Sequence, residues 1–321
     1  MILFRTNRLL PGPSMGVPLD RRSRGAATRW ATAFGLVAGL PWGRTAAGAV
    51  VSAAVSTLDD LRRILTAHPA VVVAFSGGVD SGLLAKVAHD TLGPERCLVA
   101  TAVSPSLAAD ERRACAELAA AWGLRWVEVE TDELERAAYR YNDGDRCYHC
   151  KSALMDALEP LAAPLGATVL LGVNVDDLGD HRPGQRAAAE RGATFPMVEA
   201  GLTKAAVRDH ARALGLSIWD KPAAACLASR LPYGTEVSVQ LLSQLDRAEA
   251  ALHRLGFVAV RVRHYGDTAR IEVPLEDLPG LLGRREQVVA AVHAAGYRYV
   301  TVDLEGLRSG NLNHALTDAA R

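Results

Sequence analysis

The sequence has no net charge, few cysteines and no apolar run long enough to cross a membrane. Its 36 lysines and arginines balance 36 aspartates and glutamates, so no large basic surface indicates binding to nucleic acid or to an anionic membrane. Five cysteines at irregular spacing do not match the disulfide framework of a small secreted protein. The apolar run at 31–40 is shorter than the roughly 20 residues of a membrane-spanning helix. We therefore expect a cytoplasmic protein that binds neither nucleic acid nor membrane.

The chain is long enough for two domains with sizeable cores. Its 321 residues are 49% hydrophobic and 22% charged, which is typical of a globular protein rather than a disordered one. There is no internal repeat and no low-complexity linker after the N-terminal segment. We expect three parts: an N-terminal extension at 1–55, a nucleotide-binding domain at 56–234 and a small domain at 235–321.

The first 55 residues differ from the rest of the chain. The stretch DRRSRG, followed by ATAFGLVAGL and AAGA, resembles a twin-arginine export signal. Nothing further along the chain is typical of an exported protein, however, and Met15 offers a second start. We therefore interpret this segment as a disordered extension or as a start site assigned too early.

Strand and helix patterns alternate from Ser56 to about residue 230. The run AVVVAF is continuous, apolar and β-branched, as in a strand buried on both faces of a parallel sheet. Four other segments have strand patterns, with helical patterns between them: 97–103, 125–130, 167–172 and 216–220. This alternation predicts an α/β fold, a doubly wound parallel sheet whose ligand crevice lies at the carboxyl ends of the strands.

The pattern changes after residue 235. A long helical segment, SVQLLSQLDRAEAALHRLG, precedes two strand patterns, FVAVRVRHY and TARIEVP, which a Gly-Asp pair separates. Two residues of this type between strands predict an antiparallel hairpin. A further helix near 281–295 and a last strand, RYVTVDL, follow. We expect a small α+β domain here.

The hexapeptide SGGVDS, Ser76 to Ser81, directly follows the first predicted strand. Gly77 and Gly78 let the backbone approach a ligand closely, and the N–H groups at the start of the next helix point towards an anion. The two serine hydroxyls add donors, and Asp80 is placed to hold a magnesium ion that bridges phosphates. A capped strand-to-helix turn without a ligand is the alternative. The complete pattern favours a loop that binds the phosphates of a nucleotide.

Three cysteines lie in segments that packing alone does not explain. Cys147 and Cys150 form a Cys-x-x-Cys pair in GDRCYHCK, and Cys226 follows an Asp-Lys-Pro turn in DKPAAACLASRLPYG. Two neighbouring thiolates and a third from a distant loop can hold an iron–sulfur cluster. The same thiolates with His149 can bind zinc, and the pair alone can act as a redox dithiol.

Charged residues flank Cys226. Lys221 and Arg230 lie near it in the sequence, and a nearby cation lowers the pKa of a thiol and so favours the nucleophilic thiolate. A small buried side chain is the alternative role for Cys226. Cys97, at the start of a strand, and Cys115, within a helix, are interpreted as core residues.

The SGGVDS loop lacks the Gly-Lys-Ser/Thr ending of the Walker loop and resembles the PP-loop of the ATP pyrophosphatases. These Rossmann-like enzymes release pyrophosphate and activate a carbonyl or carboxylate as an adenylate. The stretch from about residue 56 to 313 further resembles the LarE family of ATP-dependent sulfur transferases, by the order and spacing of several segments together. These segments are SGGVDS, DRCYHCK, LGVNVDDLGDHRPG, GLTKAAVRDHARALGL, DKPAAACLASRLPYG, RVRHYGDTARIEV and DLEGLRSGNLN.

The resemblance implies an activity, a substrate and a set of cofactors. Members of this family use ATP and Mg²⁺ to adenylate a carboxylate of pyridinium-3,5-biscarboxylic acid mononucleotide. They then convert it to a thiocarboxylate for the nickel-pincer nucleotide of lactate racemase. In one subtype a single cysteine, at the position of Cys226, gives up its own sulfur. In another, three cysteines hold a [4Fe–4S] cluster and transfer delivered sulfide, and the chain resembles this subtype because Cys147, Cys150 and Cys226 occupy all three positions.

Polar residues beyond the loop are expected at the site. Asn174, Asp177 and Arg182 follow a predicted strand, at the end of the sheet where the crevice belongs. Arg261 and Arg263 share one face of a strand because side chains alternate. Paired guanidinium groups can hold a substrate phosphate, and a solvated face is the alternative.

The resemblance alone supplies the remaining assignments. It makes Glu249 and Glu272 candidate metal ligands and Arg230 a candidate binding residue. It also makes Cys226 and Asp80 the expected catalytic residues.

Two other functions fit parts of the sequence. Some sulfur-inserting PP-loop enzymes act on tRNA and carry three cysteines with a cluster, but the zero net charge argues against the many phosphate contacts of tRNA binding. A non-catalytic nucleotide-binding module with structural zinc is the second alternative. We favour the pyridinium mononucleotide as substrate, and we expect a sulfide donor and a homo-oligomer.

Overall fold

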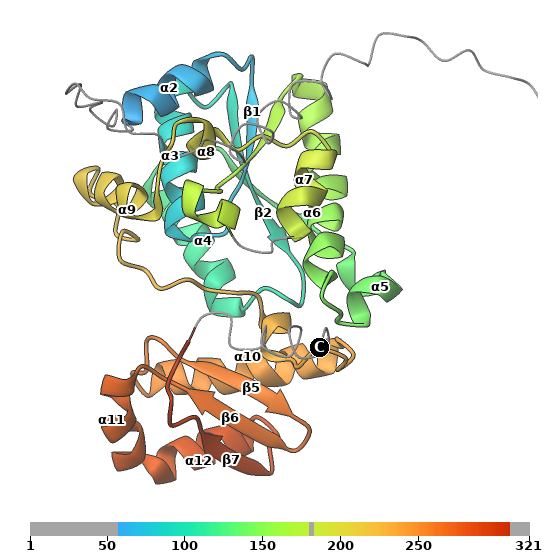
Figure 1. The fold of residues 1–321 in the computed structure, drawn as a ribbon, viewed down its shortest axis with the longest axis vertical. Helices are drawn as coiled ribbons and strands as arrows, with labels where there is room; N and C mark the ends of the chain where they lie inside the picture. The colour runs from blue at the N-terminus through green and yellow to red at the C-terminus, as the bar shows by residue number, and fades with distance from the viewer. Residues whose placement is uncertain (1–56, 180–182, 309–321) are drawn as a thin grey trace, which may run out of the picture. The chain divides into compact units, whose positions relative to one another are not determined.

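The computed structural model describes residues 57–179 and 183–308, which belong to one unit. Four parallel strands form its first sheet, in the order β3-β2-β1-β4 (Figure 1). They are β1 (Val71–Ala74), β2 (Cys97–Val103), β3 (Trp126–Glu130) and β4 (Thr168–Leu171). The order reverses between β1 and β4, so the carboxyl ends of these two strands mark the crevice in which such sheets bind ligands.

Both faces of this sheet are covered, which confirms the predicted α/β fold. Val71, Val72 and Val73 are all fully buried although they point to alternate faces. Helices lie on both sides of the sheet (Figure 1). On one side are α2 (Leu58–Thr66), α3 (Val79–Leu92) and α4 (Ala109–Ala121), and on the other are α6 (Arg146–Ala162) and α7 (Pro183–Glu190).

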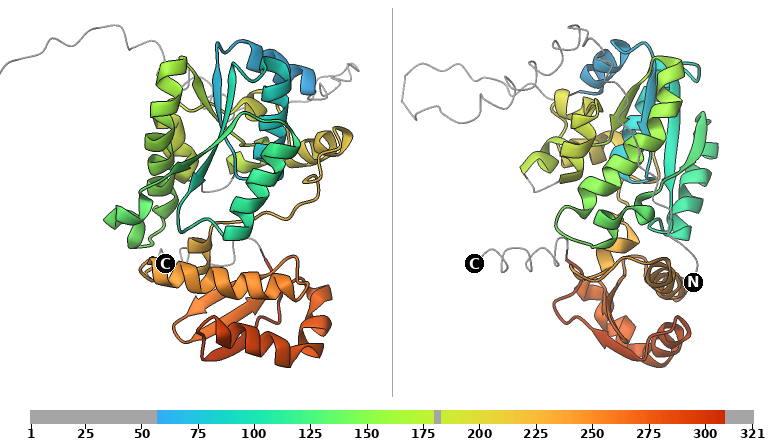
Figure 2. Two further views of the ribbon diagram at one scale, coloured as in Figure 1. Left: turned by 180° about the vertical axis from the view of Figure 1, so that it is seen from behind. Right: turned by 90° about the vertical axis from the view of Figure 1, so that its right-hand side faces the viewer.

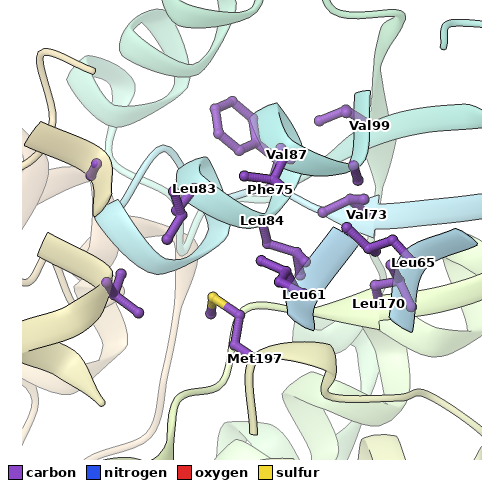
Figure 3. Close-up of a cluster of buried hydrophobic side chains, with 14 of the residues drawn as sticks. Leu61, Leu65, Val73, Phe75, Leu83, Leu84, Val87, Val99, Leu170 and Met197 are labelled. Atoms are coloured by element: carbon purple, nitrogen blue, oxygen red, sulfur yellow. The ribbon is translucent and has the colours of Figure 1, made fainter. Parts of the chain in front are cut away.

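The larger core cluster lies on the α3 side of the sheet. Figure 3 shows Val73 and Val99 of the sheet with Leu84 of α3 and with Leu61 and Leu65 of α2. All five side chains are fully buried, and each leucine or valine contributes about 1.5–3 kcal/mol by leaving water. This packing fixes the end of β1 and the start of α3, and therefore the SGGVDS segment between them.

A second cluster covers the opposite face. Leu154 and Leu158 of α6, one helical turn apart, pack with Val72 of β1. The sequence patterns did not identify α6 as a helix. It carries Cys147 and Cys150 in its first turns, so this packing also places the Cys-x-x-Cys pair.

The predicted strand at 216–220 is wrong. The backbone turns here, because the N–H of Trp219 donates to the carbonyl of Leu216 at 3.2 Å and that of Lys221 donates to Ile218 at 3.1 Å. Leu216 and Ile218 are nevertheless buried, and Ile218 fills the space that Gly82 leaves on α3. The alternation that resembled a strand therefore comes from two buried side chains, one of which, Ile218, packs on α3.

The C-terminal part forms a second, three-stranded sheet, which contains the predicted hairpin and last strand. Gly266 and Asp267 form the turn of an antiparallel hairpin, and the last strand runs parallel to the second. The strands are β5 (Arg261–Tyr265), β6 (Thr268–Glu272) and β7 (Tyr299–Val302), and α10 (Val239–Arg254), α11 (Leu278–Gly283) and α12 (Arg285–Ala294) pack on one face (Figure 2). Val262 and Ile271 point towards these helices, so Arg261 and its alternate neighbours lie on the opposite face.

The remaining described elements are short. They are α5 (Ala137–Arg140), α8 (Pro196–Glu199), α9 (Lys204–Ala213) and the 3-10 turns η1 (Glu133–Glu135), η2 (Ala163–Leu165), η3 (Val175–Gly179), η4 (Leu227–Arg230) and η5 (Leu275–Asp277). Across 57–179 and 183–308, no helix is long and apolar enough to span a membrane. The predicted extension at 1–55 lies outside the described residues, and the domain limits at 56–234 and 235–321 stay predictions.

Candidate functional site

The SGGVDS segment, which we call the phosphate loop, joins β1 to α3. Gly77 has φ +68, a left-handed conformation that glycine adopts without strain. Gly78 is the N-cap of α3, and no side chain caps the helix there, which leaves N–H groups of its first turn for a ligand. The hydroxyls of Ser76 and Ser81 lie 3.1 Å apart, and the Ser76 N–H donates to the Ser81 hydroxyl at 3.2 Å. The loop thus has the donors expected of an anion site.

Two residues from other elements hold Asp80, in the first turn of α3. Its carboxylate accepts a hydrogen bond from the side-chain amide of Asn174 at 3.0 Å and forms an ion pair with Lys204. Asn174 is buried just beyond β4, and Lys204 is the first residue of α9. Residues that follow β1 and β4 therefore meet at the carboxyl edge of the sheet. Sequence patterns gave no sign of the contact between Lys204 and Asp80.

The loop after β4 is ordered by its own carboxylates. Asp177 accepts a hydrogen bond from the N–H of Asn174 at 3.1 Å, and the side-chain carbonyl of Asn174 accepts from the N–H of Asp176 at 3.0 Å. Asp176 in turn accepts from the N–H of Lys204 at 2.7 Å. These bonds position the amide that contacts Asp80. Arg182, predicted to share this site, lies outside the described residues.

Gly172 lets the end of β4 approach the phosphate loop. A Cβ atom here would lie 2.7 Å from the backbone nitrogen of Ser81 and 2.8 Å from its Cα. Backbone atoms cannot move aside as the end of a flexible side chain can, so any larger residue would displace the start of α3. A glycine after a buried strand is the sequence signal that could have identified this close approach.

Lys221 contacts the phosphate loop. Its ammonium group donates to the carbonyl of Gly77 at 3.2 Å and to the carboxylate of Glu111 at 2.7 Å. The sequence suggested that Lys221 acts on Cys226, and the structure instead gives it these two partners. Because Lys221 begins the segment that leads to Cys226, this contact connects that segment to the phosphate loop.

The three predicted cysteines lie at the starts of two elements. Cys147 and Cys150 are three residues apart in the first turns of α6, and Cys226 is the N-cap of η4. Cys147 and Cys226 are exposed and Cys150 is half-buried, whereas Cys97 and Cys115 are fully buried core residues, as predicted. Burial raises the pKa of Cys150 to about 12.

The charges of these thiols act on one another. Burial has the largest effect on the pKa of Cys150; Lys151 lowers it, and charges on Cys226 and Cys147 raise it. Burial lowers the pKa of Arg146, but charges on Cys226 and Cys147 raise it, and the net direction is upward. In the described part of the chain, no three His, Cys, Asp or Glu side chains lie near enough together to hold one metal ion. A four-iron cluster binds its thiolates through different irons and so accepts more widely spaced ligands.

Four buried residues near the Cys226 loop form two ion pairs, which we call the arginine–glutamate network. Arg230 donates to Glu249 at 2.9 and 3.0 Å, and Arg263 lies 2.9 Å from the carboxylate of Glu272. Glu249 also accepts from the N–H of Val262 at 2.8 Å. Both glutamates, the candidate metal ligands, are therefore bonded to guanidinium groups in this structure.

The network holds the backbone around Cys226. Arg230 donates to the carbonyls of Ala225 at 2.7 Å and Cys226 at 3.3 Å. Arg263 donates to the carbonyl of Ser229 at 2.7 Å. Burial lowers the pKa of Arg230, but Glu249 and, more weakly, Cys226 raise it, and the net direction is upward. The guanidinium thus stays charged beside the thiol.

Arg261 differs from the other arginines of this sheet face. It is buried and donates to the carbonyls of Arg308 at 3.1 Å and Ala223 at 3.4 Å. Among the residues that the structure describes, no carboxylate lies within salt-bridge distance of it. Burial and the charges of Arg230 and Arg263 lower its pKa. An anionic ligand would relieve this repulsion.

The chain has three curated relatives of similar length. It is 38% identical, over 266 residues or 83% of its length, to pyridinium-3,5-bisthiocarboxylic acid mononucleotide synthase from Lactiplantibacillus plantarum, and the match covers 94% of that protein. It is 45% identical over 266 residues to an uncharacterized protein of Synechocystis sp., covering 82% of this chain and 98% of the other. It is 26% identical over 240 residues to an uncharacterized protein of Methanocaldococcus jannaschii, covering 74% and 91%. No protein-family model matches the sequence.

The fold and the phosphate loop define an α/β protein of the PP-loop class, with its polar groups at the carboxyl edge of a parallel sheet. Within this class the chain belongs to the LarE family, the family of pyridinium-3,5-bisthiocarboxylic acid mononucleotide synthase.

Proposed function

We propose that the chain is an ATP-dependent sulfur transferase that converts a carboxylate of pyridinium-3,5-biscarboxylic acid mononucleotide to a thiocarboxylate. The product would serve the nickel-pincer nucleotide, the cofactor of lactate racemase. The observation that carries this proposal is the 38% identity to the Lactiplantibacillus plantarum synthase, over 94% of that protein. The phosphate loop supports it, because adenylation of a carboxylate needs a site for ATP.

In the first half-reaction, a carboxylate oxygen of the substrate attacks the α-phosphorus of ATP. The bond to the β-phosphate breaks and pyrophosphate leaves. The N–H groups at the start of α3 and the hydroxyls of Ser76 and Ser81 would bind phosphate oxygens. Asp80 offers the carboxylate oxygens that Mg²⁺ prefers, and its bond to Asn174 keeps it in place. Lys204 would then release Asp80 and form an ion pair with a phosphate oxygen of ATP instead.

In the second half-reaction, a sulfur nucleophile attacks the carbonyl carbon of the acyl adenylate and AMP leaves. We propose that Cys147, Cys150 and Cys226 hold a [4Fe–4S] cluster, for which thiolates are the usual ligands. When bound by these three cysteines, such a cluster would supply the sulfide for transfer. Arg146 fits a site with negative charge, because it is buried and has no carboxylate within salt-bridge distance among the described residues.

Arg261 is the residue we propose for the phosphate of the substrate. Its guanidinium group bonds only to backbone carbonyls among the described residues, whereas Arg230 and Arg263 are paired with glutamates. Glu249 and Glu272 stay proposed metal ligands, and a cation there would compete with both arginines. A cytoplasmic location, a homo-oligomer, a sulfide donor and the absence of nucleic acid stay predictions.

Product analysis tests the reaction. The purified protein, kept free of oxygen, is incubated with the biscarboxylic mononucleotide, ATP, Mg²⁺ and sulfide. We expect AMP and pyrophosphate, and a mononucleotide whose mass shows sulfur in place of a carboxylate oxygen. Formation of ADP and phosphate, or a product without sulfur despite AMP release, would contradict the proposal.

Metal analysis tests the cluster separately. We expect iron and acid-labile sulfide in protein purified without oxygen, and less of both after Cys147→Ala, Cys150→Ala or Cys226→Ala. Cys97→Ala is the matched control, because Cys97 is a fully buried core residue. An iron-free active protein that loses hydrogen sulfide from Cys226 on turnover would show the sacrificial route and leave the other two cysteines without this role.

A further inference from the structure

Cys226 and the pair on α6 come from distant segments, and a buried polar contact joins these segments. Asn142 lies in the turn before α6 and is fully buried. It has φ +55, and no other residue except glycine has a positive φ in the described part of the chain. Asparagine tolerates this conformation better than most residues, but its free-energy cost must be offset by the contacts that hold it.

The side chain of Asn142 holds the segment that follows Cys226. Its amide donates to the carbonyls of Pro232 at 2.7 Å and Thr235 at 3.0 Å. Its backbone carbonyl accepts from the N–H of Gly234 at 3.1 Å. A buried amide must find partners for its donors, so a shift of this segment away from α6 would lose several hydrogen bonds together.

Arg146 extends the contact to the cysteines themselves. It directly precedes Cys147, and its buried guanidinium group donates to the side-chain carbonyl of Asn142 and to the backbone carbonyl of Ala228 at 2.9 Å. Ala228 lies two residues after Cys226. One guanidinium group therefore connects the first turn of α6, with its two cysteines, to the backbone beside the third.

We propose that Asn142 and Arg146 are positioning residues that fix the separation between Cys226 and the cysteine pair on α6. The importance of this separation for sulfur transfer rests on the proposed function, but the separation itself is a property of the folded chain. A purely stabilising role would lower the free energy of unfolding and leave the thiols of the folded protein equally close. The test must therefore measure the proximity of the thiols.

Cross-linking of Cys147 to Cys226 gives this measurement. A Cys150→Ser parent keeps these two exposed thiols, while Cys97 and Cys115 are fully buried. A short bismaleimide is added to the metal-free parent, and intact mass separates one bridging reagent from two singly attached ones. We expect bridging in the parent, and about tenfold less in the parent with Arg146→Met, because the effective concentration of one thiol near the other falls.

Two more variants separate positioning from folding. Asn142→Gly keeps a residue that accepts φ +55 but removes the side-chain bonds, and we expect it to lower bridging as well. Arg146→Lys keeps a donor that can reach Ala228, and we expect it to recover part of the bridging. Each variant is checked for a single cooperative melting transition, which shows that the protein whose bridging is measured is folded.

Two outcomes would overturn the proposal. One is parent-level bridging in folded Arg146→Met and Asn142→Gly proteins. The other is a parent that does not bridge at all, because the two thiols are then not held within reach. The cross-linking uses no ATP, iron or substrate. Its result therefore does not depend on whether the proposed sulfur transfer is correct.

Discussion

The phosphate loop and the arginine–glutamate network hold opposite charges together in different environments. The side chains of Asp80 and Lys204, at the loop, are 22% and 35% exposed. Those of Arg263 and Glu272, in the network, are 4% and 0% exposed. Exposed ion pairs contribute only about 0–1 kcal/mol, so the loop can exchange its internal partner for a ligand at low cost. Breaking a buried pair leaves an uncompensated charge, so the network is suited to holding a structure rather than to releasing it.

The two regions also differ in how far their parts lie apart in the sequence. The phosphate loop is a single strand–turn–helix segment, with later additions from Asn174 and Lys204. The network joins the Cys226 loop, α10 and the β5–β6 hairpin through Arg230, Glu249 and Glu272. The proposed nucleotide site therefore depends on local geometry, and the proposed sulfur site depends on the packing of the C-terminal sheet.

The largest effect should follow loss of a carboxylate in the network. Glu272→Ala leaves Arg263 buried without its partner, so we expect a loss of about 3–5 kcal/mol in the free energy of unfolding. Urea denaturation measures it. The double variant Arg263→Met/Glu272→Leu should recover part of the loss, because apolar side chains of similar size need no partner. If the Glu272→Ala protein were as stable as the Asp80→Asn protein, the network would not differ from the phosphate loop in its contribution to stability.

Loss of the carboxylate in the phosphate loop should affect activity instead. For Asp80→Asn we expect pyrophosphate release to fall roughly 10²–10³-fold, the usual effect of removing one preorganised electrostatic contact. Stability should change by less than about 1 kcal/mol, because the Asp80–Lys204 pair is partly exposed. Coupled pyrophosphate detection and urea denaturation on the same protein separate the two effects. A large loss of stability with normal activity would assign Asp80 a structural role.

The same contrast explains what could be predicted from the sequence. The parallel sheet, the hairpin and the phosphate loop were predicted because each depends on a short continuous segment. The sheet was predicted from apolar strands, the hairpin from a Gly-Asp turn, and the phosphate loop from a glycine-rich segment before a helix. The strand at 216–220 was wrong because packing on α3 produced the same alternation as a strand. The periodicity of apolar residues indicates which side chains are buried, but it does not indicate which helix or strand they pack against.

Contacts between distant segments were not predicted. Lys204 lies 124 residues from Asp80 and Ala228 lies 82 residues from Arg146, and nothing in the short motifs around them indicates these partners. A lysine at a helix start and an arginine before a cysteine have common alternative roles on a solvated surface. Only the tertiary fold decides between them. The candidate site was therefore predicted as a set of motifs, without the contacts that hold them.

The cysteines test whether the sulfur site combines both kinds of environment. Burial raises the pKa of Cys150 to about 12, and the thiolate is the form that attacks iodoacetamide and displaces iodide. In metal-free protein at pH 8 we expect Cys150 to be alkylated at least about tenfold more slowly than exposed Cys147 and Cys226. Peptide mass spectrometry measures the three rates. In denaturant the difference should disappear, and equal rates in the folded protein would show that Cys150 is not protected.

The smallest effect concerns His264, a buried polar residue on the core-facing side of β5. Its ring Nδ1 lies 3.3 Å from the hydroxyl of Tyr297, and burial lowers its pKa below the usual 6.5. The unfolded chain therefore binds a proton at a higher pH than the folded protein does. Stability is unaffected by this group above pH 6.5 and falls as the pH drops below it. Urea denaturation between pH 7 and pH 5 should show this slope in Asp80→Asn as in the parent, because the phosphate loop does not contact His264. His264→Gln should flatten it, and a slope that persists in His264→Gln would mean that another group takes up the proton.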